Sequence, residues 1–451
     1  MEYNILDFGA VADGVTNNAA AIQRAIDEAT IRGGKVIIPS GRFLSGTLTL
    51  KSNVELYLET GAVLISSLNP ADILDFAKLF SDDNRETGWD GGCFLFACHE
   101  ENITIAGNGT IYGQGDKVFF DDDTDGGYHE SPLNVVAFRP RLTFFEDVEN
   151  LTIRDVTIRD AAFWTLHMAG CRHVMVNGVR ILNDVRGANN DGIDPDSCKD
   201  VIISNCYIEG GDDAIVVKST KPMAERYGGC ENIIITNCIL HSHDSALKVG
   251  TETWGDIRNL VMGDCVVKDC SRGIGIWVRD GATIEDIHVH HITGAVRKYA
   301  DAMRPEGPSR WWGNGEPVFI NATYRNQKYV NEGHYPGKIR NITFDHIYLK
   351  AECSAFFAGE ENTRIENVRM EDFCITMCKQ GTQESGFFDE QPSLRDVYPH
   401  KIPGIYARSV DGLYLKGEVR FIEPYSLEKN GLIDTEDCSK ILIELNRRLP
   451  E

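Results

Sequence analysis

The chain has 451 residues, of which 42% are hydrophobic and 25% are charged, so it can bury a sizeable core and disorder is not expected. Its 68 acidic and 45 basic residues give a formal net charge of -23, a balance that repels nucleic acid and anionic membranes. No stretch approaches the roughly 18 consecutive apolar residues of a membrane helix. These properties exclude nucleic-acid and membrane partners and leave the oligomeric state open.

The first predicted element is a helix over residues 16–29. Thr16 can cap its start, and Gly33-Gly34 ends it. Its apolar stripe consists of Ala21, Ile22, Ala25, Ile26 and Ala29. Because the first coil of a stacked fold leaves strand edges unpaired, we expect this helix to close the N-terminal end.

A repeat then runs from about residue 100 to the C-terminus. Each unit has a polar residue, often Asn or Asp, then alternating apolar residues, a short polar turn and a second β-type run. The units begin at Asn150, His173, Asp200, Asn232, Asn259, Asp286 and Asn341, and successive starts lie 23, 27, 32, 27, 27 and 55 residues apart. The last interval is two repeats or one repeat with a long insertion. Period-2 alternation makes the elements strands, and helical signals are almost absent. The repeat predicts an all-β, right-handed parallel β-helix, a solenoid with an N-terminal capping helix.

We expect one domain over residues 1–451. Residues 1–50 form the N-terminal cap and first coil, residues 100–410 the main coils, and residues 411–451 the C-terminal cap. Insertions near 116–131 and 299–331 should form loops above one face, where repeat proteins commonly build a binding groove.

Thirteen cysteines are spread along the chain, an odd number without a CxxC pair. Several recur at one place in the repeat, for example Cys206, Cys238 and Cys265. This pattern favours buried thiols in a reducing compartment over disulfides or a zinc site. The N-terminus shows neither a basic region nor an apolar run of secretory length, so a cytoplasmic location is expected, or a secreted one if a leader was removed.

Three aspartates are expected to meet at one point of the solenoid. Asp191 precedes one coil, and Asp212 and Asp213 lie 21 and 22 residues later, about one coil on. Clustered carboxyls repel one another, so at least one pKa should rise and keep a proton near neutral pH. Glycoside hydrolysis needs such an acid together with a base that activates water. Calcium binding and simple turn capping are the other interpretations.

At these residues the sequence resembles family 28 of the glycoside hydrolases, the polygalacturonase family, over residues 3–325. The segments NNDGIDPDSC and GGDDAIVVKS are similar to its Asn-Thr-Asp and Gly-Asp-Asp motifs. The resemblance implies an inverting hydrolase without a metal or other cofactor. It also implies that Asp213 donates the proton and that Asp191 and Asp212 hold and activate water. Inversion predicts acid and base carboxyls roughly 6.5–9.5 Å apart.

The resemblance also supplies substrate-binding candidates. Tyr324, in EPVFINATY, matches a substrate-site tyrosine of the family. The family's Gly-His-Gly segment corresponds to HDSALKVGTE, where the histidine column falls on Asp244 or Ser245, and His243 is one residue away. His243 replaces the family histidine if the turn shifts. Glu252, which ends this segment, is also a candidate, as is His167 at the end of an earlier matching stretch.

The family's Arg-Ile-Lys motif, which binds a galacturonate carboxylate, corresponds to RGIGIW, which begins at Arg272. Gly275 and Trp277 replace the two cations, and strand alternation places both on the outer face. We expect Trp277 to be a stacking platform for a sugar ring, unless it is a packed aromatic under a loop. Lys218 and Lys248 share the outward phase and are expected to hold a carboxylate or a hydroxyl of the substrate.

These observations predict a glycosidase that acts on oligosaccharides of pectin type, galacturonide or rhamnogalacturonan-derived, from a chain end. Three alternatives remain open: a hydrolase of a neutral glycoside, a calcium-dependent polysaccharide lyase, and a carbohydrate-binding β-helix without catalysis.

Overall fold

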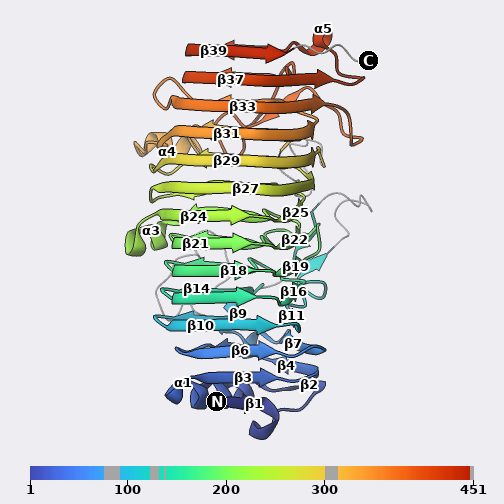
Figure 1. Cartoon of the computed structure of the whole chain (residues 1–451), viewed down its shortest axis with the longest axis vertical. Helices are drawn as coiled ribbons and strands as arrows, with labels where there is room; N and C mark the ends of the chain where they lie inside the picture. The colour runs from blue at the N-terminus through green and yellow to red at the C-terminus, as the bar shows by residue number, and fades with distance from the viewer. Residues whose placement is uncertain (76–91, 122–131, 137–138, 300–312, 447–451) are drawn as a thin grey trace.

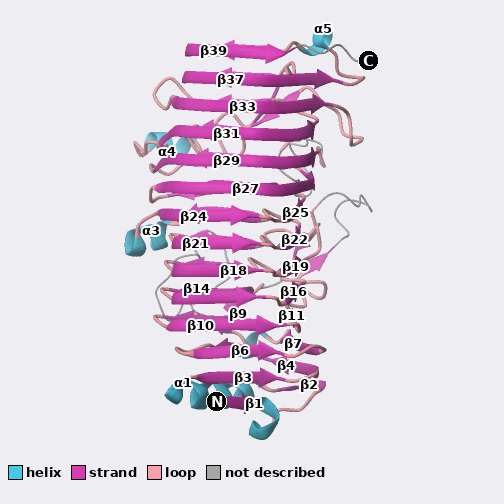
Figure 2. Cartoon of the chain, viewed as in Figure 1, coloured by secondary structure: helices cyan, strands magenta, loops and turns pink. Residues whose placement is uncertain are grey.

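The computed structural model describes residues 1–75, 92–121, 132–136, 139–299 and 313–446. Strands stacked in chain order form one elongated parallel β-helix, with the N-terminus at one end and the last described strand, β39, at the other (Figure 1). The predicted fold class is therefore confirmed. Helices are few and lie at the periphery (Figure 2). No helix in the described ranges is long and apolar enough to cross a membrane.

Two large sheets carry the coils, and two short antiparallel pairs accompany them. The 22-stranded sheet contains β1 (Glu2–Asn4), β2 (Asp13–Asn17), β3 (Gly34–Ile38), β4 (Gly41–Ser45), β6 (Val54–Leu58), β7 (Ala62–Ser66), β10 (Glu101–Gly107), β11 (Thr110–Tyr112), β15 (Glu149–Arg154), β16 (Thr157–Arg159), β18 (Arg172–Asn177), β19 (Arg180–Leu182), β21 (Lys199–Ser204), β22 (Tyr207–Gly210), β24 (Cys230–Thr236), β25 (Ile239–Ser242), β27 (Ile257–Cys270), β29 (Thr283–Val296), β31 (Lys338–Ala351), β33 (Ile365–Met377), β37 (Val410–Phe421) and β39 (Ser439–Asn446). The 13-stranded sheet contains β5 (Leu48–Thr49), β8 (Leu74–Asp75), β9 (Gly92–Cys98), β14 (Arg141–Glu146), β17 (Leu166–Ala169), β20 (Ile193–Asp196), β23 (Ile215–Ser219), β26 (Ser245–Thr253), β28 (Arg272–Val278), β30 (Glu316–Ala322), β32 (Ala355–Ala358), β36 (Ile405–Arg408) and β38 (Ile433–Glu436). The antiparallel pairs are β12 (Phe120–Asp121) with β13 (Asn134–Val135), and β34 (Phe387–Asp389) with β35 (Val397–Pro399).

The first polar residue of each repeat aligns neighbouring coils with one another. The seven repeat-starting residues all adopt a left-handed backbone, with φ between 52° and 60°. Asn and Asp tolerate this conformation better than other non-glycine residues, and it turns the chain at the coil corner. Their side chains also bond between coils: Asn259 Nδ2 donates to Asn232 Oδ1 at 3.1 Å, and Asn341 Nδ2 to Asp286 Oδ1 at 3.0 Å. The 55-residue interval is one coil with an insertion, because β29 pairs directly with β31.

The apolar stripe predicted for the capping helix is buried, but the helix begins later than expected. Helix α1 spans Ala19–Arg32, Asn18 is its N-cap residue, and Thr16 lies in β2. Asn18 ties this corner together, since Val11 N donates to its Oδ1 at 2.7 Å and its Nδ2 donates to Thr16 O at 2.8 Å. The other helices are α3 (Lys221–Tyr227), α4 (Gln327–Asn331), α5 (Leu427–Asn430) and the 3-10 turns η1 (Ile5–Phe8) and η2 (Pro70–Asp72).

The predicted limits of the coils and loops need correction. Coils also occupy the interval between residues 50 and 100, where β6 pairs with β3 and β10. They continue through β37 and β39 in the segment expected to be a cap. The insertion predicted at 299–331 is wrong in part, because strand β30 and helix α4 lie inside it. Its residues 300–312, and residues 122–131 of the other predicted insertion, lie outside the described residues.

All 13 cysteines are free thiols, and ten of them are buried. Cys206, Cys238 and Cys265 stack in consecutive coils and belong to the core. The prediction of buried thiols is confirmed for these three residues.

Candidate active site

The three aspartates lie at the ends of two turns that enter neighbouring strands of the 13-stranded sheet. Asp191 precedes β20, and Asp212 and Asp213 precede β23, which pairs with β20. One carboxylate oxygen from each residue lies within 4.8 Å of the others. The predicted meeting of the three carboxyls is therefore confirmed.

The turns hold these carboxyls through Asn190 and a glycine. Asn190 Oδ1 accepts hydrogen bonds from Gly211 N at 2.7 Å and Asp212 N at 3.3 Å, so one turn is bonded directly to the next. A Cβ on Gly211 would lie 2.3 Å from Gly187 O, so only glycine permits this approach. Asn189 N and Asp213 N donate to the two oxygens of Asp212, at 3.2 and 2.9 Å. These bonds fix the direction of the Asp212 carboxyl.

Two buried lysines pair with the cluster from β23 and β26. Lys248 Nζ lies 2.6 Å from Asp213 Oδ2, and Lys218 Nζ lies 3.2 Å from Asp191 Oδ2 and 2.8 Å from Asp194 Oδ1. Both lysines are at most 6% exposed. They point toward the aspartates as their predicted phase requires, but their ammonium groups are already engaged by carboxylates of the protein.

Burial raises the pKa of several carboxyls here. It raises the pKa of Asp212 to about 7, and the negative charges of Asp191 and Asp213 add to the effect. Burial also raises the pKa of Asp194 to about 6 and that of Asp191 well above its usual range. Asp213 differs in its contacts, because Lys248 Nζ lies 2.6 Å from its Oδ2. The cluster therefore combines a carboxyl that keeps its proton near neutral pH with a carboxyl that is paired with a lysine.

A fourth carboxyl, Asp244, stands at one of the two positions to which the resemblance assigns the family histidine, the other being Ser245. Asp244 is 5% exposed, and burial raises its pKa to about 7, followed by the charge of Asp213. Ser245 Oγ donates to Asp244 Oδ1 at 2.9 Å, and Ser245 N donates to Asp213 Oδ1 at 3.3 Å. His243 instead stacks on Tyr299 with ring centroids 3.8 Å apart, and burial lowers its pKa to about 3. This stacking favours a packed histidine over a replacement for the family residue.

Trp277 is not the exposed sugar platform that was predicted. It shares a face with Gly275, as strand alternation requires, but it is 1% exposed. Its ring lies over Gly275, where a Cβ would be 2.0 Å from Trp277 Cζ3, and packs against Phe319 at 4.9 Å. Lys248 Nζ lies 5.0 Å from the centre of the same ring. Trp277 thus supports Lys248, and through it Asp213, from within the protein.

Gly275→Ala is expected to destabilise the protein by about 1–3 kcal/mol, because the added methyl group must displace the indole ring. Chemical denaturation of the wild type and of Gly275→Ala measures this effect. An unchanged unfolding midpoint for Gly275→Ala would contradict the packing described for Trp277.

Two further predicted substrate residues, Arg272 and Glu252, interact with charged residues of the protein. Arg272 is buried, 3.3 Å from Glu316, and donates to Asp389 O at 2.8 Å. Glu252 is half-buried, and the positive charges of Lys218 and Arg325 outweigh burial and lower its pKa. Glu252 is therefore coupled electrostatically to Lys218, the lysine beside Asp191.

Tyr324 and His167 make their contacts elsewhere. The Tyr324 hydroxyl accepts a bond from Asn362 Nδ2 at 2.5 Å, on the coil that follows its own. His167 is 2% exposed, with Nε2 3.3 Å from Asp196 Oδ2, and it packs edge-on against Trp164. The predicted substrate contacts of both residues remain predictions, and the burial of His167 favours a structural role.

The sequence did not identify Asp194 as a member of the cluster, nor Asp244 as a buried carboxyl next to it. Asp194 follows Asp191 by three residues in the same motif and lies in β20, where its side chain turns toward Lys218. The signal for Asp194 is strand alternation: Ile193 points inward, so the next side chain in the strand points outward, toward the cluster. Arg325, which pairs with Asp280 at 2.8 Å, had no such signal because it follows β30 in a turn.

The cluster also satisfies the spacing of a cation site, since its three carboxylate oxygens are mutually close. Hard divalent cations prefer six to eight oxygen ligands. Here Lys218 and Lys248 already neutralise Asp191 and Asp213. Their positions suit acid–base chemistry without a metal.

Several known proteins are similar to this chain. A family model described as glycosyl hydrolases family 28 matches residues 31–305. A probable polygalacturonase of Vitis vinifera is 30% identical over 66% of this chain and 61% of its own length. An exo-poly-alpha-D-galacturonosidase of Dickeya chrysanthemi is 30% identical over 47% of this chain and 41% of its own length. The chain thus spans 61% and 41% of the length of these two curated relatives.

Solved structures share the fold. An exopolygalacturonase from Thermotoga maritima superposes with a TM-score of 0.67 at 24% identity, over 84% of this chain and 88% of its own. A family 28 exopolygalacturonase of Yersinia enterocolitica gives 0.67 at 18% identity, over 99% and 79%. At these identities the likeness concerns the fold alone.

Proposed function

Because the chain belongs to family 28 of the glycosyl hydrolases, we propose that it hydrolyses glycosidic bonds with Asp191, Asp212 and Asp213. The observation that carries the proposal is the mutual approach of these carboxyls within 4.8 Å, beside two lysines. Hydrolysis needs a protonated carboxyl for the leaving oxygen and an ionised one for water, and the cluster supplies both.

We assign the proton donor to Asp212 and the base to Asp213, the reverse of the roles that the family resemblance implies. Asp212 has a pKa of about 7 and is the most exposed of the three, so its proton can reach a bound substrate. Asp213 is 2% exposed, and its Oδ2 is paired with Lys248 Nζ at 2.6 Å. Asp191, bonded to Lys218, completes the water site.

The family supports an inverting reaction, in which water attacks from the side opposite to the leaving group. The closest carboxylate oxygens lie within 4.8 Å, shorter than the roughly 6.5–9.5 Å expected between acid and base groups of inverting enzymes. Inversion here therefore requires water bound beside the cluster, against Asp191 and Asp213, with the sugar seated across Asp212.

The substrates proposed are oligosaccharides of pectin type, galacturonide or rhamnogalacturonan-derived, cleaved from a chain end. The names of the curated relatives from Vitis vinifera and Dickeya chrysanthemi support galacturonide and exo action. A neutral glycoside is the second candidate. It is favoured because Gly275 and Trp277 replace two cations, and because Lys218 and Lys248 are engaged by the protein's own carboxylates.

A substrate panel separates these candidates. Oligogalacturonides, rhamnogalacturonan oligosaccharides and their carboxyl-reduced counterparts are incubated with the full chain, and reducing ends and products are followed by chromatography. The galacturonide proposal predicts single sugars released from the acidic oligosaccharides. Cleavage of the reduced counterparts alone would identify a neutral glycosidase. Binding without any cleavage would contradict hydrolysis and identify a carbohydrate-binding β-helix.

Chelation tests the lyase alternative. EDTA is expected to leave the rate unchanged, because the lysines already neutralise the carboxyls, and no unsaturated product should absorb in the ultraviolet. Loss of activity with EDTA, restored by Ca²⁺, together with ultraviolet absorption would identify a calcium-dependent lyase. The measurement is the reaction rate with and without the chelator.

We further propose a cytoplasmic location, supported by the 13 free thiols and their stacked column in the core. Such thiols are kept reduced in a reducing compartment. Immunoblotting of cell fractions tests the location, and recovery of the protein outside the cell would contradict it.

A further inference from the structure

A pair of adjacent histidines lies on the outer face of the 22-stranded sheet. His290 and His291 lie in β29, between the buried residues Val289 and Ile292. In a regular strand, neighbouring side chains point to opposite faces. The left-handed backbone of His291, with φ 50°, breaks this alternation, so that both imidazoles project outward.

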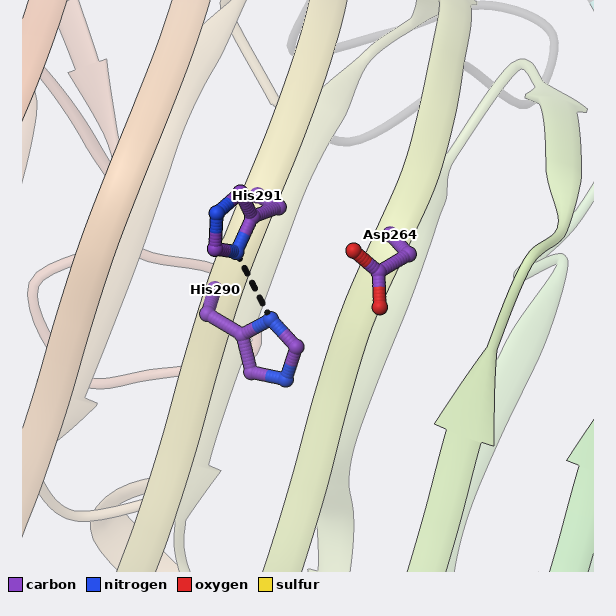
Figure 3. Close-up of side chains that lie close together, drawn as sticks. All are labelled: Asp264, His290 and His291. Carbon is purple, nitrogen blue, oxygen red and sulfur yellow. Dashed lines mark hydrogen bonds between the residues drawn. The ribbon is translucent and has the colours of Figure 1, made fainter.

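The two imidazoles converge with a carboxylate from the preceding coil. The Nδ1 atoms of His290 and His291 lie 3.1 Å apart (Figure 3). Asp264, at the equivalent corner of β27, offers an oxygen, and one possible ligand atom from each of the three residues lies within 4.8 Å of the other two. Two nitrogen ligands at 2.0–2.1 Å from a tetrahedral Zn²⁺ lie ~3.3 Å apart, so the histidine spacing suits such an ion.

Two neighbours hold this arrangement. Gly263 pairs with His290 across the coils, and a Cβ there would lie 2.2 Å from His290 Cε1, so the imidazole lies on the glycine. The His346 ring stacks on that of His291 with centroids 4.5 Å apart and planes at 10°, and its Nδ1 lies 2.9 Å from Asp345 Oδ1. Each histidine of the pair is thus positioned by a residue that supplies none of the three ligand atoms.

We propose that Asp264, His290 and His291 bind a zinc ion, with water in the fourth position. Two imidazoles and one carboxylate suit Zn²⁺, whereas Ca²⁺ and Mg²⁺ prefer oxygen ligands throughout. Each imidazole binds through Nδ1 and carries its proton on Nε2, so the hydrogen bond between the two Nδ1 atoms is replaced by two metal bonds.

The zinc site joins two coils and is independent of the glycosidase proposal. Asp264 comes from β27 and both histidines from β29, so the ion links strands that are otherwise joined by the backbone ladder. The three aspartates flank the 13-stranded sheet instead. Because the folded chain alone presents the three ligands together, binding stabilises it.

Calorimetric titration of the full chain with ZnCl₂, after removal of metals, tests the site. We expect one zinc per chain, and a dissociation constant raised at least about tenfold by either His290→Ala or His291→Ala, because even the loss of a residue that only orients a metal ligand costs about tenfold or more. Gly263→Ala keeps all three ligands but displaces the His290 ring, so it should weaken binding too. Zinc should raise the Tm of the wild type and leave that of His290→Ala unchanged.

His173→Ala is the matched control. His173 also has a left-handed backbone, with φ 52°, and lies 3.7 Å from each of Glu149 and Asp200, but it has no adjacent histidine. Its loss should leave zinc binding unchanged. Zinc binding that survives both His290→Ala and His291→Ala, as it would at the aspartate cluster, would overturn the proposal, and so would an absence of binding.

Discussion

Replacing Asp212 by Asn should lower kcat by about 10²–10⁴-fold, the usual contribution of a general acid. Asp212 has a pKa of about 7 and is the most exposed carboxyl of the cluster, so it can deliver a proton to the leaving oxygen. Asn keeps the shape of the side chain but has no proton to donate. Steady-state kinetics on the best oligosaccharide of the panel measure the loss.

A change of leaving group distinguishes the acid from the base. An activated aryl glycoside departs without protonation, so Asp212→Asn should recover most of its rate on that substrate. Asp213→Asn should remain impaired on both substrates, because water activation is still needed. Recovery by Asp213→Asn and not by Asp212→Asn would restore the roles that the family resemblance implies.

The raised pKa of Asp212 also gives two dependences on pH. Activity requires the protonated form, so kcat/KM should fall as the pH rises through about 7. The folded chain binds this proton more tightly than the unfolded chain, whose aspartates titrate near 3.9. The stabilisation is therefore complete below that value and is lost as the pH rises toward 7. When the pH is raised from 5 to 8, the wild type should lose about 1–2 kcal/mol more of its free energy of unfolding than Asp212→Asn loses. This figure allows for the partial exposure of Asp212.

A large loss of stability is expected when the buried pair of Asp213 and Lys248 is broken. Either Asp213→Asn or Lys248→Met alone leaves one buried charge without its partner, which costs about 3–5 kcal/mol of the free energy of unfolding. The double variant removes both charges and should recover most of that stability, but not the activity. Denaturant unfolding and kinetics of the four proteins give the coupling between the two residues.

Stability losses that simply add in the double variant would contradict the pairing seen at 2.6 Å. Lys218→Met serves as the matched comparison, since Lys218 lies among Asp191 and Asp194 on the neighbouring strand. It should not couple to Asp213→Asn as strongly as Lys248→Met does.

Much of the fold was predictable because it depends on local rules. A polar residue that tolerates a left-handed backbone begins each coil, and period-2 alternation follows it, so strands and corners repeat visibly in the sequence. The meeting of Asp191 with Asp212 and Asp213 follows from the same repeat, since one coil of separation places residues side by side. The repeat does not identify coils of irregular length. For this reason the segment that forms β30 was predicted to be part of a loop.

The environment of the site was less predictable because it depends on packing between coils. Strand alternation correctly placed Trp277 on the outer face. Its exposure is only 1% because the ring packs against Phe319 of the next coil and lies over Gly275, which has no side chain. Lysines that point outward look available to a substrate in the sequence. Their pairing with Asp213 and Asp191 appears only when the coils are stacked.

The measurement that tests the central claim most directly is ¹H NMR of the products while the full chain acts on the oligosaccharide that it cleaves fastest. It records bond cleavage and the anomer formed first in one experiment. We expect new reducing ends with inverted anomeric configuration, and no such signal from Asp212→Asn. Unsaturated products, no products at all, or wild-type rates in Asp212→Asn would contradict this expectation.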